Sequence, residues 1–330
     1  MCVARRIALL FALTCAALPA FADSCKLVLV AEWPVRLVGG LPIVQGAVNG
    51  HALGILIDTG ASRSAIMKVA ADRLALPRHA TDSRIYGVGG ISHAEMVQID
   101  EVRIEKMTRK NWRVLALGER DLGRNIGFLL GADFFEHLDL EIDYAAGAMR
   151  LFDSQGCGST SLAYWAKDGA GVVEIDRDTT IRFRVLVNAT PVSAMLDTGA
   201  STSILDLSVA AGLGIAPGGP GVVAGGCAGG LGSNMIERWV GTFESFSIGD
   251  ETIRNAKLMI SNFWMYTTAI ETGSRIPRGP VGRPSMLIGT DFLRTHRVYI
   301  ARSQRKLYFT YAGGLVFPSV PKGDCGRPQS

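Results

Sequence analysis

Two aspartates of this chain occupy the same unusual setting. Asp58 follows the apolar run Ile55-Leu56-Ile57, Asp197 follows Ala194-Met195-Leu196, and both begin the motif Asp-Thr-Gly-Ala-Ser. Carboxylates are rarely buried behind apolar residues without a partner. If the two copies pack about a pseudo-twofold axis, the two carboxyl groups meet and share one proton, because neighbouring carboxylates cannot both ionise. The ionised member can then deprotonate a water while the protonated member polarises a peptide carbonyl, without a metal or a covalent intermediate.

The residues around each aspartate suit a loop that holds a carboxyl group. Gly60 and Gly199 permit a sharp turn or a close backbone approach, and Thr59 and Thr198 can donate their hydroxyls to hold the loops. Each copy also has a glycine cluster further on, "YGVGG" at 86–90 and "AGGCAGG" at 224–230. These clusters are either ordinary hairpin turns or mobile flaps above a site.

The chain repeats itself along most of its 330 residues. The stretch 48–62 aligns with 187–201 at an offset of 139, and "LLGADFF" (129–135) aligns with "LIGTDFL" (287–293) at an offset of 158. Each copy predicts a hairpin, the aspartate motif, a short helix, a glycine-rich hairpin, strands, an apolar-apolar-Gly element and two further strands. The 19 extra residues of the second copy are assigned to 261–284, a predicted surface loop near the cleft.

This order of motifs resembles the retropepsin- and pepsin-like aspartic peptidases, in particular bacterial retropepsin-like proteins with two lobes on one chain. Beside the two aspartate motifs, Leu129-Leu130-Gly131 and Leu287-Ile288-Gly289 match the element that packs behind the catalytic loop in that family. The resemblance covers residues 30–153 and 172–312. It implies an all-β fold with short helices, in two similar lobes related by pseudo-twofold symmetry with one cleft between them.

The resemblance also implies an activity and a set of site residues. The activity is that of an aspartic endopeptidase, a hydrolase acting on peptide or protein substrates, in which Asp58 and Asp197 activate a water. Thr59, Gly60, Thr198 and Gly199 would shape the catalytic loops. The flaps would hold an extended peptide by backbone hydrogen bonds, and their expected residues are Tyr86, Gly87, Val88, Gly89, Gly90, Gly225, Gly226, Cys227 and Gly229. No cofactor and no metal are expected.

The chain departs from the pepsin pattern directly after each Asp-Thr-Gly. Ala61 and Ala200 stand where pepsin-like enzymes have Ser or Thr, whose hydroxyl can hydrogen-bond the carboxylate. Losing a hydrogen bond to the charged form leaves the carboxyl pKa values less depressed. The sequence therefore predicts a pH optimum less acidic than that of a typical pepsin-like enzyme.

Other acidic residues receive structural interpretations. Asp133 and Asp291 recur in both copies and are interpreted as helix N-caps. The stretch "EHLDLEID" (136–143) alternates as a strand does, with its acidic residues predicted to face outward. The chain has no His-Glu-x-x-His and no Gly-x-Ser-x-Gly, which argues against metalloprotease and serine hydrolase chemistry.

Two alternatives to a self-contained enzyme stay open. The chain could be a non-catalytic peptide-binding or scaffold protein that keeps the fold. Its two lobes could also lie apart, each pairing with a lobe of another chain, instead of forming a monomer with an intramolecular lobe pair. With a formal net charge of +4 and no Lys/Arg cluster, the sequence shows no footprint of nucleic-acid binding.

The N-terminus is predicted to be an export signal. Arg5 and Arg6 precede the apolar run 7–18, and Ala20-Phe21-Ala22 supplies a cleavage pattern. The run is too short to span a bilayer, and a retained N-terminal anchor is the alternative. We therefore expect an exported protein, periplasmic or secreted. The expected organisation is a signal peptide at 1–22, a lobe at 23–155, a linker at 156–171, a lobe at 172–315 and a tail at 316–330.

Four cysteines follow the predicted signal: Cys25, Cys157, Cys227 and Cys325. An even number in an exported protein favours disulfides, and three connectivities are open. Cys227 stands in the glycine-rich loop and is the candidate for an unpaired thiol. The wide spacing of these cysteines argues against a zinc site.

Overall fold

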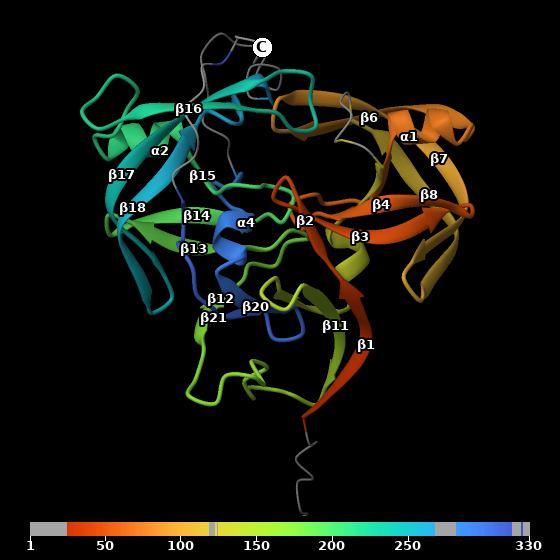
Figure 1. Cartoon of the computed structure of the whole chain (residues 1–330), viewed down its shortest axis with the longest axis horizontal. Helices are drawn as coiled ribbons and strands as arrows, with labels where there is room; N and C mark the ends of the chain where they lie inside the picture. The colour runs from red at the N-terminus through yellow and green to blue at the C-terminus, as the bar shows by residue number, and fades with distance from the viewer. Residues whose placement is uncertain (1–24, 119–122, 124, 268–281, 319–324, 326–330) are drawn as a thin grey trace, which may run out of the picture.

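The computed structural model describes residues 25–118, 123, 125–267, 282–318 and 325, and most of them lie in β-strands. The strands form two lobes side by side, with a third sheet below and between them (Figure 1). The predicted all-β fold with short helices and two similar lobes is confirmed. The predicted signal peptide at 1–22 lies outside the described residues, and the domain boundaries stay predictions.

The first lobe is built on an eight-stranded sheet whose ends approach each other, because β3 pairs with β7 as well as β4. Asn49 and Gly50 both have positive φ, 47° and 81°, as the predicted two-residue hairpin turn requires. The strands in spatial order are β2 (Arg36–Val38), β3 (Leu41–Val48), β4 (His51–Ile57), β9 (Ile126–Leu130), β5 (Ala65–Met67), β8 (Met107–Leu117), β7 (Gly90–Ile104) and β6 (Arg78–Gly87). The short helices are α1 (Lys68–Arg73) and the 3₁₀ helix η1 (Ala132–Phe135).

The second lobe repeats this arrangement with seven strands. Asn188 and Ala189 make its first turn with φ of 47° and 62°, so here an alanine adopts the left-handed conformation. The strands in spatial order are β13 (Arg182–Val187), β14 (Thr190–Leu196), β19 (Met286–Ile288), β15 (Ile204–Asp206), β18 (Glu251–Ser261), β17 (Ile236–Ile248) and β16 (Val223–Ala228). Helices α2 (Leu207–Gly212) and α4 (Thr290–Leu293) correspond to α1 and η1. The short helix predicted after each aspartate motif is confirmed.

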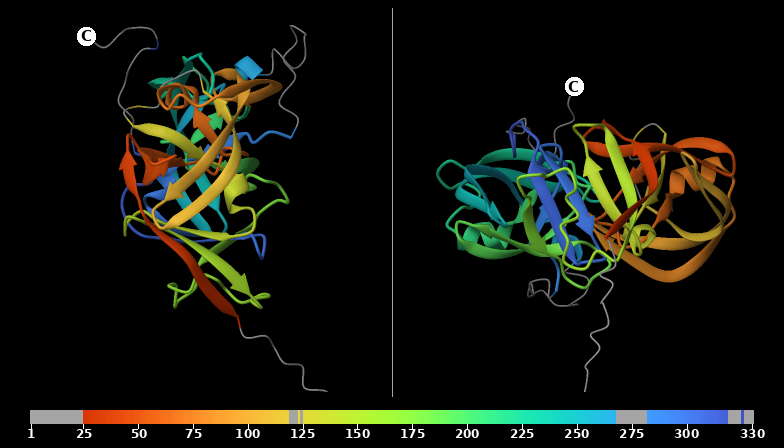
Figure 2. Two further views of the ribbon diagram at one scale, coloured as in Figure 1. Left: turned by 90° about the vertical axis from the view of Figure 1, so that its right-hand side faces the viewer. Right: turned by 90° about the horizontal axis from the view of Figure 1, so that it is seen from below.

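The third sheet joins the lobes, because it takes strands from both halves (Figure 2). Its central pairing is antiparallel, with Leu140 opposite Ile300 and Ile142 opposite Val298. The strands in spatial order are β1 (Lys26–Pro34), β11 (Ala148–Gln155), β10 (Asp139–Asp143), β20 (His296–Ala301), β21 (Lys306–Tyr311) and β12 (Gly171–Glu174). A single hydrophobic core runs through this sheet into both lobes, which fixes the lobes relative to each other.

The prediction that the acidic residues of β10 face outward is wrong. Asp139, Glu141 and Asp143 are all buried, and Glu141 is 0% exposed. Glu141 accepts hydrogen bonds from Arg150 at 2.8 Å and from the Tyr164 hydroxyl at 2.5 Å. The segment after β11, which contains Tyr164, covers the face of the sheet on which these acidic residues lie. Alternation alone assigns this face to solvent, but because it is buried its carboxylates need charged or hydrogen-bonding partners.

Both cysteine pairs form disulfides, Cys25–Cys157 and Cys227–Cys325. The interpretation of Cys227 as an unpaired thiol is therefore wrong. Its partner lies 98 residues away, and nothing in the local glycine-rich stretch points to it. Among the described residues, every helix is too short or too polar to cross a lipid bilayer.

Candidate active site

The two aspartates lie at the ends of equivalent buried strands, Asp58 after β4 and Asp197 after β14. Each strand runs parallel to the apolar strand of the apolar-apolar-Gly element, β9 or β19. The Asp58 N–H donates to the Leu130 carbonyl at 3.0 Å, and the Asp197 N–H donates to the Ile288 carbonyl at 2.9 Å. The repeat therefore positions both aspartates by the same backbone contact.

Thr59 and Thr198 link the two loops by a reciprocal set of hydrogen bonds. The Thr59 hydroxyl donates to the Leu196 carbonyl at 2.8 Å and accepts from the Thr198 N–H at 3.2 Å. The Thr198 hydroxyl donates to the Ile57 carbonyl at 2.6 Å and accepts from the Thr59 N–H at 3.0 Å. Both threonines are buried. Each loop is thus held by the backbone of the opposite lobe.

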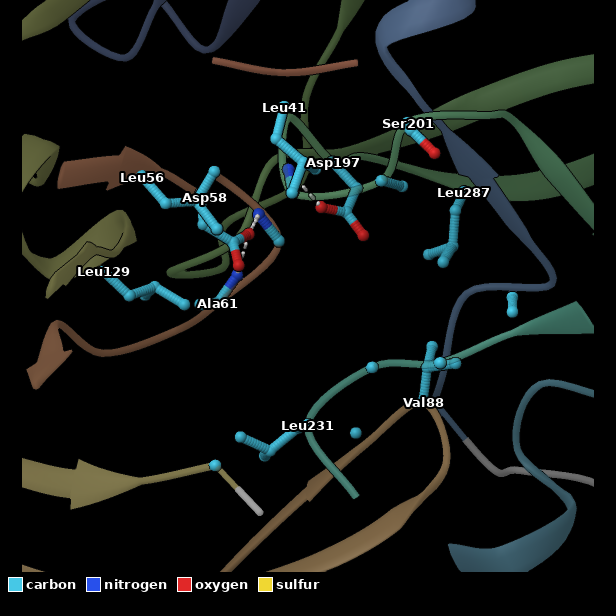
Figure 3. Close-up of a pocket in the computed structure, with 18 of the residues that line it drawn as sticks. Leu41, Leu56, Asp58, Ala61, Val88, Leu129, Asp197, Ser201, Leu231 and Leu287 are labelled. Atoms are coloured by element: carbon cyan, nitrogen blue, oxygen red, sulfur yellow. Dashed lines mark hydrogen bonds between the residues drawn. The ribbon is translucent and has the colours of Figure 1, made fainter. Parts of the chain in front are cut away.

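The two carboxyl groups lie side by side because the loops interlock at their glycines. A Cβ at Gly60 would lie 2.5 Å from the Asp197 Cγ, and a Cβ at Gly199 would lie 2.5 Å from the Asp58 Cγ. A side chain at either position would therefore displace the carboxyl group of the opposite aspartate. The Asp58 Oδ1 accepts from the N–H groups of Gly60 and Ala61, both at 3.0 Å, and the Asp197 Oδ1 accepts from the Gly199 N–H at 2.9 Å (Figure 3).

The surroundings favour the protonated form of this pair. Burial raises the pKa of Asp197 well above its usual value, and the negative charge of Asp58 raises it further. Burial also raises the pKa of Asp58, against the opposing effect of the N–H groups of Ala61 and Gly60. The two groups interact directly and titrate as a unit. The pair therefore retains a proton to a higher pH than an isolated aspartate does.

We expect Asp197→Asn to stabilise the fold more at neutral pH than at acidic pH. Folding raises the pKa of Asp197, so the folded state binds a proton that the unfolded chain releases, and stability falls as the pH rises through the folded pKa. Asparagine has no proton to lose and escapes this penalty. Urea unfolding of both proteins at about pH 4 and about pH 7 measures the difference. An equal stability change at both pH values would contradict this cause.

A serine and an aspartate hold the apolar-apolar-Gly element behind each loop. In the first lobe the Ser64 hydroxyl donates to Asp133 at 2.7 Å and accepts from the Gly131 N–H at 3.0 Å. In the second lobe the Ser203 hydroxyl donates to Asp291 at 2.6 Å and accepts from the Gly289 N–H at 2.9 Å. A Cβ at Gly131 would lie 2.5 Å from the carbonyl carbon of Arg63, so glycine is required there.

The interpretation of Asp133 and Asp291 as helix N-caps is therefore wrong. The residues at the cap positions of η1 and α4 are Gly131 and Gly289, and neither helix has a side-chain cap. The two aspartates are held by serine hydroxyls and N–H groups of the loop after each motif instead. Sequence reasoning missed these serines, although they recur at the same offset of 139 as the catalytic motif.

A cavity of about 370 Å³ lies between the two lobes, with the carboxyl groups of Asp58 and Asp197 at one side. Its walls are mainly apolar, and Val88 and Leu231 lie across it from the aspartates (Figure 3). Of the residues predicted for the site, those that line it are Asp58, Gly60, Tyr86, Gly87, Val88, Asp197, Gly199 and Gly229. Gly89, Gly90, Gly225, Gly226 and Cys227 do not line it, and Thr59 and Thr198 lie behind its floor.

The tips of two hairpins, β6–β7 and β16–β17, meet above the aspartates. The Val88 carbonyl accepts from the Gly232 N–H at 3.1 Å. The Gly89 carbonyl accepts from the N–H of Asn234 at 3.1 Å and from its side-chain amide at 2.9 Å. The hydrogen-bond donors of the second hairpin thus lie beyond the cluster 224–230 that the sequence singled out, whose last residue, Gly230, packs against Val88. The loop 231–235 after that cluster has a single glycine, so the glycine density that marks the cluster does not extend to it.

The insertion predicted at 261–284 is described only at its two ends, and residues 268–281 lie outside the described residues. Trp264 lines the cavity, and its indole N–H donates to the Pro284 carbonyl at 3.0 Å. The Arg283 guanidinium lies 5.1 Å from the Trp264 ring centroid and 5.8 Å from that of Tyr86. The ends of the insertion therefore reach the first hairpin beside the cavity.

Comparison with known proteins identifies one family. Residues 44–134 and 183–292 both match the family model described as "Aspartyl protease", and each segment contains one of the paired aspartates. No curated protein sequence matches the chain. Among solved structures, the chain is similar to the aspartic proteinase from Irpex lacteus at 12% identity, with a TM-score of 0.48 and coverage of 85% of this chain and 97% of that chain.

Proposed function

Because this chain belongs to the aspartyl protease family, we propose that it is an aspartic endopeptidase whose catalytic residues are Asp58 and Asp197. The observation that carries the proposal is the contact between the two carboxyl groups, each packed against the glycine of the opposite loop at the side of a cavity between the lobes. Burial of a like-charged pair is costly, and such cost concentrates at functional sites. A purely structural role would be served equally well by neutral side chains.

The proposed reaction uses one proton shared by the two aspartates. The ionised carboxylate takes a proton from a water that attacks the peptide carbonyl, while the protonated carboxyl donates to the carbonyl oxygen. The resulting tetrahedral diol breaks its C–N bond as the amine receives a proton from the pair and one hydroxyl of the diol returns a proton to the pair, which restores the singly protonated state. The N–H groups of Gly60, Ala61 and Gly199 hold the carboxylates in position. The hairpin tips would bind the peptide backbone in an extended conformation.

The rival proposal is a peptide-binding protein without catalysis. The two are separated by incubating the purified protein with an unfolded polypeptide and titrating a pepstatin-like inhibitor into the reaction. We expect cleavage that ceases when one equivalent of inhibitor per chain is bound. Binding of the polypeptide with no cleavage at any pH would instead favour the rival.

We expect the pH optimum of cleavage to be less acidic than that of pepsin-like enzymes. Activity needs one ionised and one protonated carboxyl, and burial raises the pKa of both Asp58 and Asp197. Raising both pKa values moves the whole bell-shaped profile to higher pH. The profile of kcat/KM against pH, on one peptide substrate, measures this. An optimum at about pH 2, as a pepsin-type pair would give, would contradict it.

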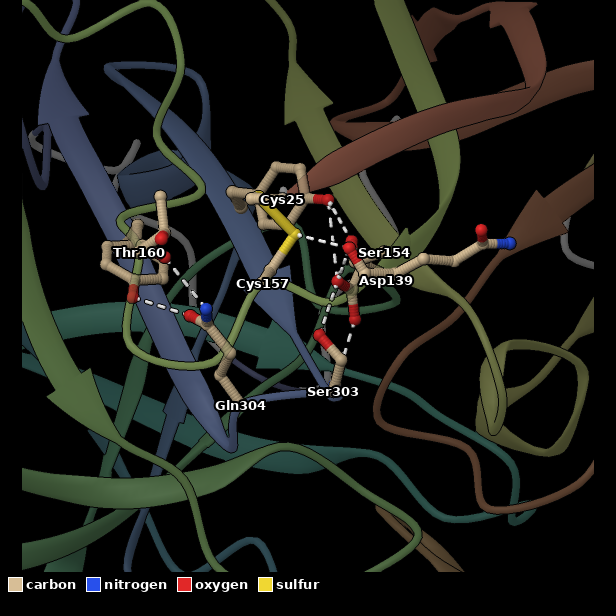
Figure 4. The surroundings of a disulfide bond; sticks show 10 residues. Cys25, Asp139, Ser154, Cys157, Thr160, Ser303 and Gln304 are labelled. Atoms are coloured by element: carbon tan, nitrogen blue, oxygen red, sulfur yellow. Dashed lines mark hydrogen bonds between the residues drawn. A yellow bond between two sulfur atoms is a disulfide. The ribbon is translucent and has the colours of Figure 1, made fainter. Parts of the chain in front are cut away.

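We further propose that the protein is an exported monomer, periplasmic or secreted. Both halves of the site come from one chain, and the core that joins the lobes is continuous. The two disulfides favour an oxidising compartment. The Cys25–Cys157 bond lies beside the buried Asp139, which accepts hydrogen bonds from Ser154 and Ser303 (Figure 4).

A further inference from the structure

One arginine of the cavity has no acidic partner among the described residues. Arg238 lies on β17, opposite Gly226 of β16, and lines the cavity on the side of the second lobe. Its guanidinium donates one long hydrogen bond, from Nη1 to the Thr202 hydroxyl at 3.4 Å. Thr202 directly follows the second Asp-Thr-Gly-Ala-Ser motif. The guanidinium is therefore held next to the loop that carries Asp197.

The charge of Arg238 is poorly compensated in the part of the chain that the structure describes. Its Nε is buried and lacks a hydrogen-bond acceptor, and none of the ion pairs found there involves it. Burial lowers its pKa. For Arg150 burial acts in the same direction, but Glu141 and Glu32 outweigh it and the pKa is raised. A buried donor without an acceptor is costly, so its persistence needs an explanation.

The fold itself does not require an arginine at this position. The strand registers of the two lobes place Ala94 of β7 where Arg238 stands on β17. Ala94 is buried in an apolar cluster with Leu115 and Leu117. The first lobe thus fills this place with a methyl group, whereas the second lobe presents a cation to the cavity. At this pair of equivalent strand positions, only the second lobe carries a cation.

We propose that Arg238 is a specificity residue that pairs with a carboxylate of the bound peptide. The inference rests on the proposed function, since it assigns the class of substrate that the same cleft accepts. A guanidinium binds a carboxylate through two parallel hydrogen bonds, and its Nε is one of the donors that this geometry uses. An apolar side chain at this point leaves the buried Nε unsatisfied, and a Gln amide offers one neutral acceptor oxygen in place of two charged ones. The carboxylate belongs either to a Glu or Asp side chain or to the C-terminus of the peptide.

The test compares matched peptides that differ by one Glu→Gln change at successive positions around the cleaved bond. We expect wild type to cleave one Glu peptide with a kcat/KM about tenfold to 100-fold above that of its Gln counterpart. Arg238→Gln should remove this ratio, and Arg238→Lys should restore part of it. C-terminally amidated versions separate the two sources: a preference that amidation abolishes belongs to the chain end.

Two further arginines serve as controls. Arg184→Gln removes the same charge from an exposed position on β13, outside the cavity. Arg63→Gln removes the exposed arginine that lines the cavity from the first lobe. We expect both variants to keep the Glu/Gln ratio of wild type. A wild-type ratio near one, or a ratio that survives in Arg238→Gln and is lost in Arg63→Gln, overturns the inference.

A binding measurement separates this inference from the proposed function. Calorimetry on Asp197→Asn, with and without Arg238→Gln, gives the Kd of the same Glu and Gln peptides without turnover. Tighter binding of a Glu peptide that depends on Arg238 supports the proposed carboxylate-binding role of Arg238. If this binding is found but neither the wild type nor any variant cleaves a peptide, only the proposed function fails. If kcat/KM and Kd are both the same for the Glu and Gln peptides, the proposed role of Arg238 is contradicted and the proposed function is unaffected.

Discussion

Asp58→Asn and Asp197→Asn are each expected to lower kcat/KM for peptide cleavage by about 10³-fold or more. Each carboxyl group lies against the glycine of the opposite loop, so one water can contact both groups in a single site. An asparagine leaves the pair unable to hold one proton and one negative charge at once. The measurement is cleavage of a fluorogenic peptide by each purified variant at the pH optimum of wild type.

The matched control is Asp168→Asn, which neutralises an exposed carboxyl in the segment between β11 and β12. It should cleave the peptide at the wild-type rate. Thermal unfolding of all three variants excludes loss of the fold as the cause. If either active-site variant kept about half of the activity, each aspartate would belong to a separate site, and pairing of each lobe with the same lobe of another chain would be favoured over a single intramolecular cleft.

The sequence predicts those parts of the fold whose signals are local and duplicated. The Asn49-Gly50 turn and its counterpart at Asn188 mark the hairpins that lead to the aspartates, because positive φ at these positions selects the turn type. The apolar runs before each aspartate predict buried strands, and the second copy supports each assignment made in the first. The two-lobed fold follows from this internal repetition.

The sequence does not predict contacts whose partners lie far along the chain. Alternation places the acids of β10 on one face of a strand, but only the covering segment with Tyr164 decides that this face is buried. Asp133 stands at the start of a helix as a cap does, yet Ser64, 69 residues away, takes its carboxylate. In each case a long-range partner outweighs the local preference, and no pattern in the neighbouring residues records it.

The hydrogen bonds of Thr59 and Thr198 are predictable in part, because their donors follow from a local motif whereas their acceptors lie far along the chain. The motif predicts hydroxyl donors, but the acceptors are backbone carbonyls of the opposite lobe at separations of 137 and 141 residues. These bonds lie directly beneath the paired carboxyl groups. The geometry of the dyad therefore depends on how firmly the two lobes are joined at this point, as well as on the third sheet below.

Thr198→Val is accordingly expected to lower the free energy of unfolding by about 2–5 kcal/mol, because it leaves the Ile57 carbonyl and the Thr59 N–H buried without their partner. Valine keeps the shape of threonine, so little packing is lost. Thr198→Ser is the matched control, since it keeps the hydroxyl and loses one methyl group. Urea unfolding of the three proteins measures the difference in stability. In the valine variant we also expect kcat to fall by a larger factor than KM rises, because the carboxyl groups lose their alignment. Equal stability of the valine and serine variants would show that these hydrogen bonds do not hold the lobes together.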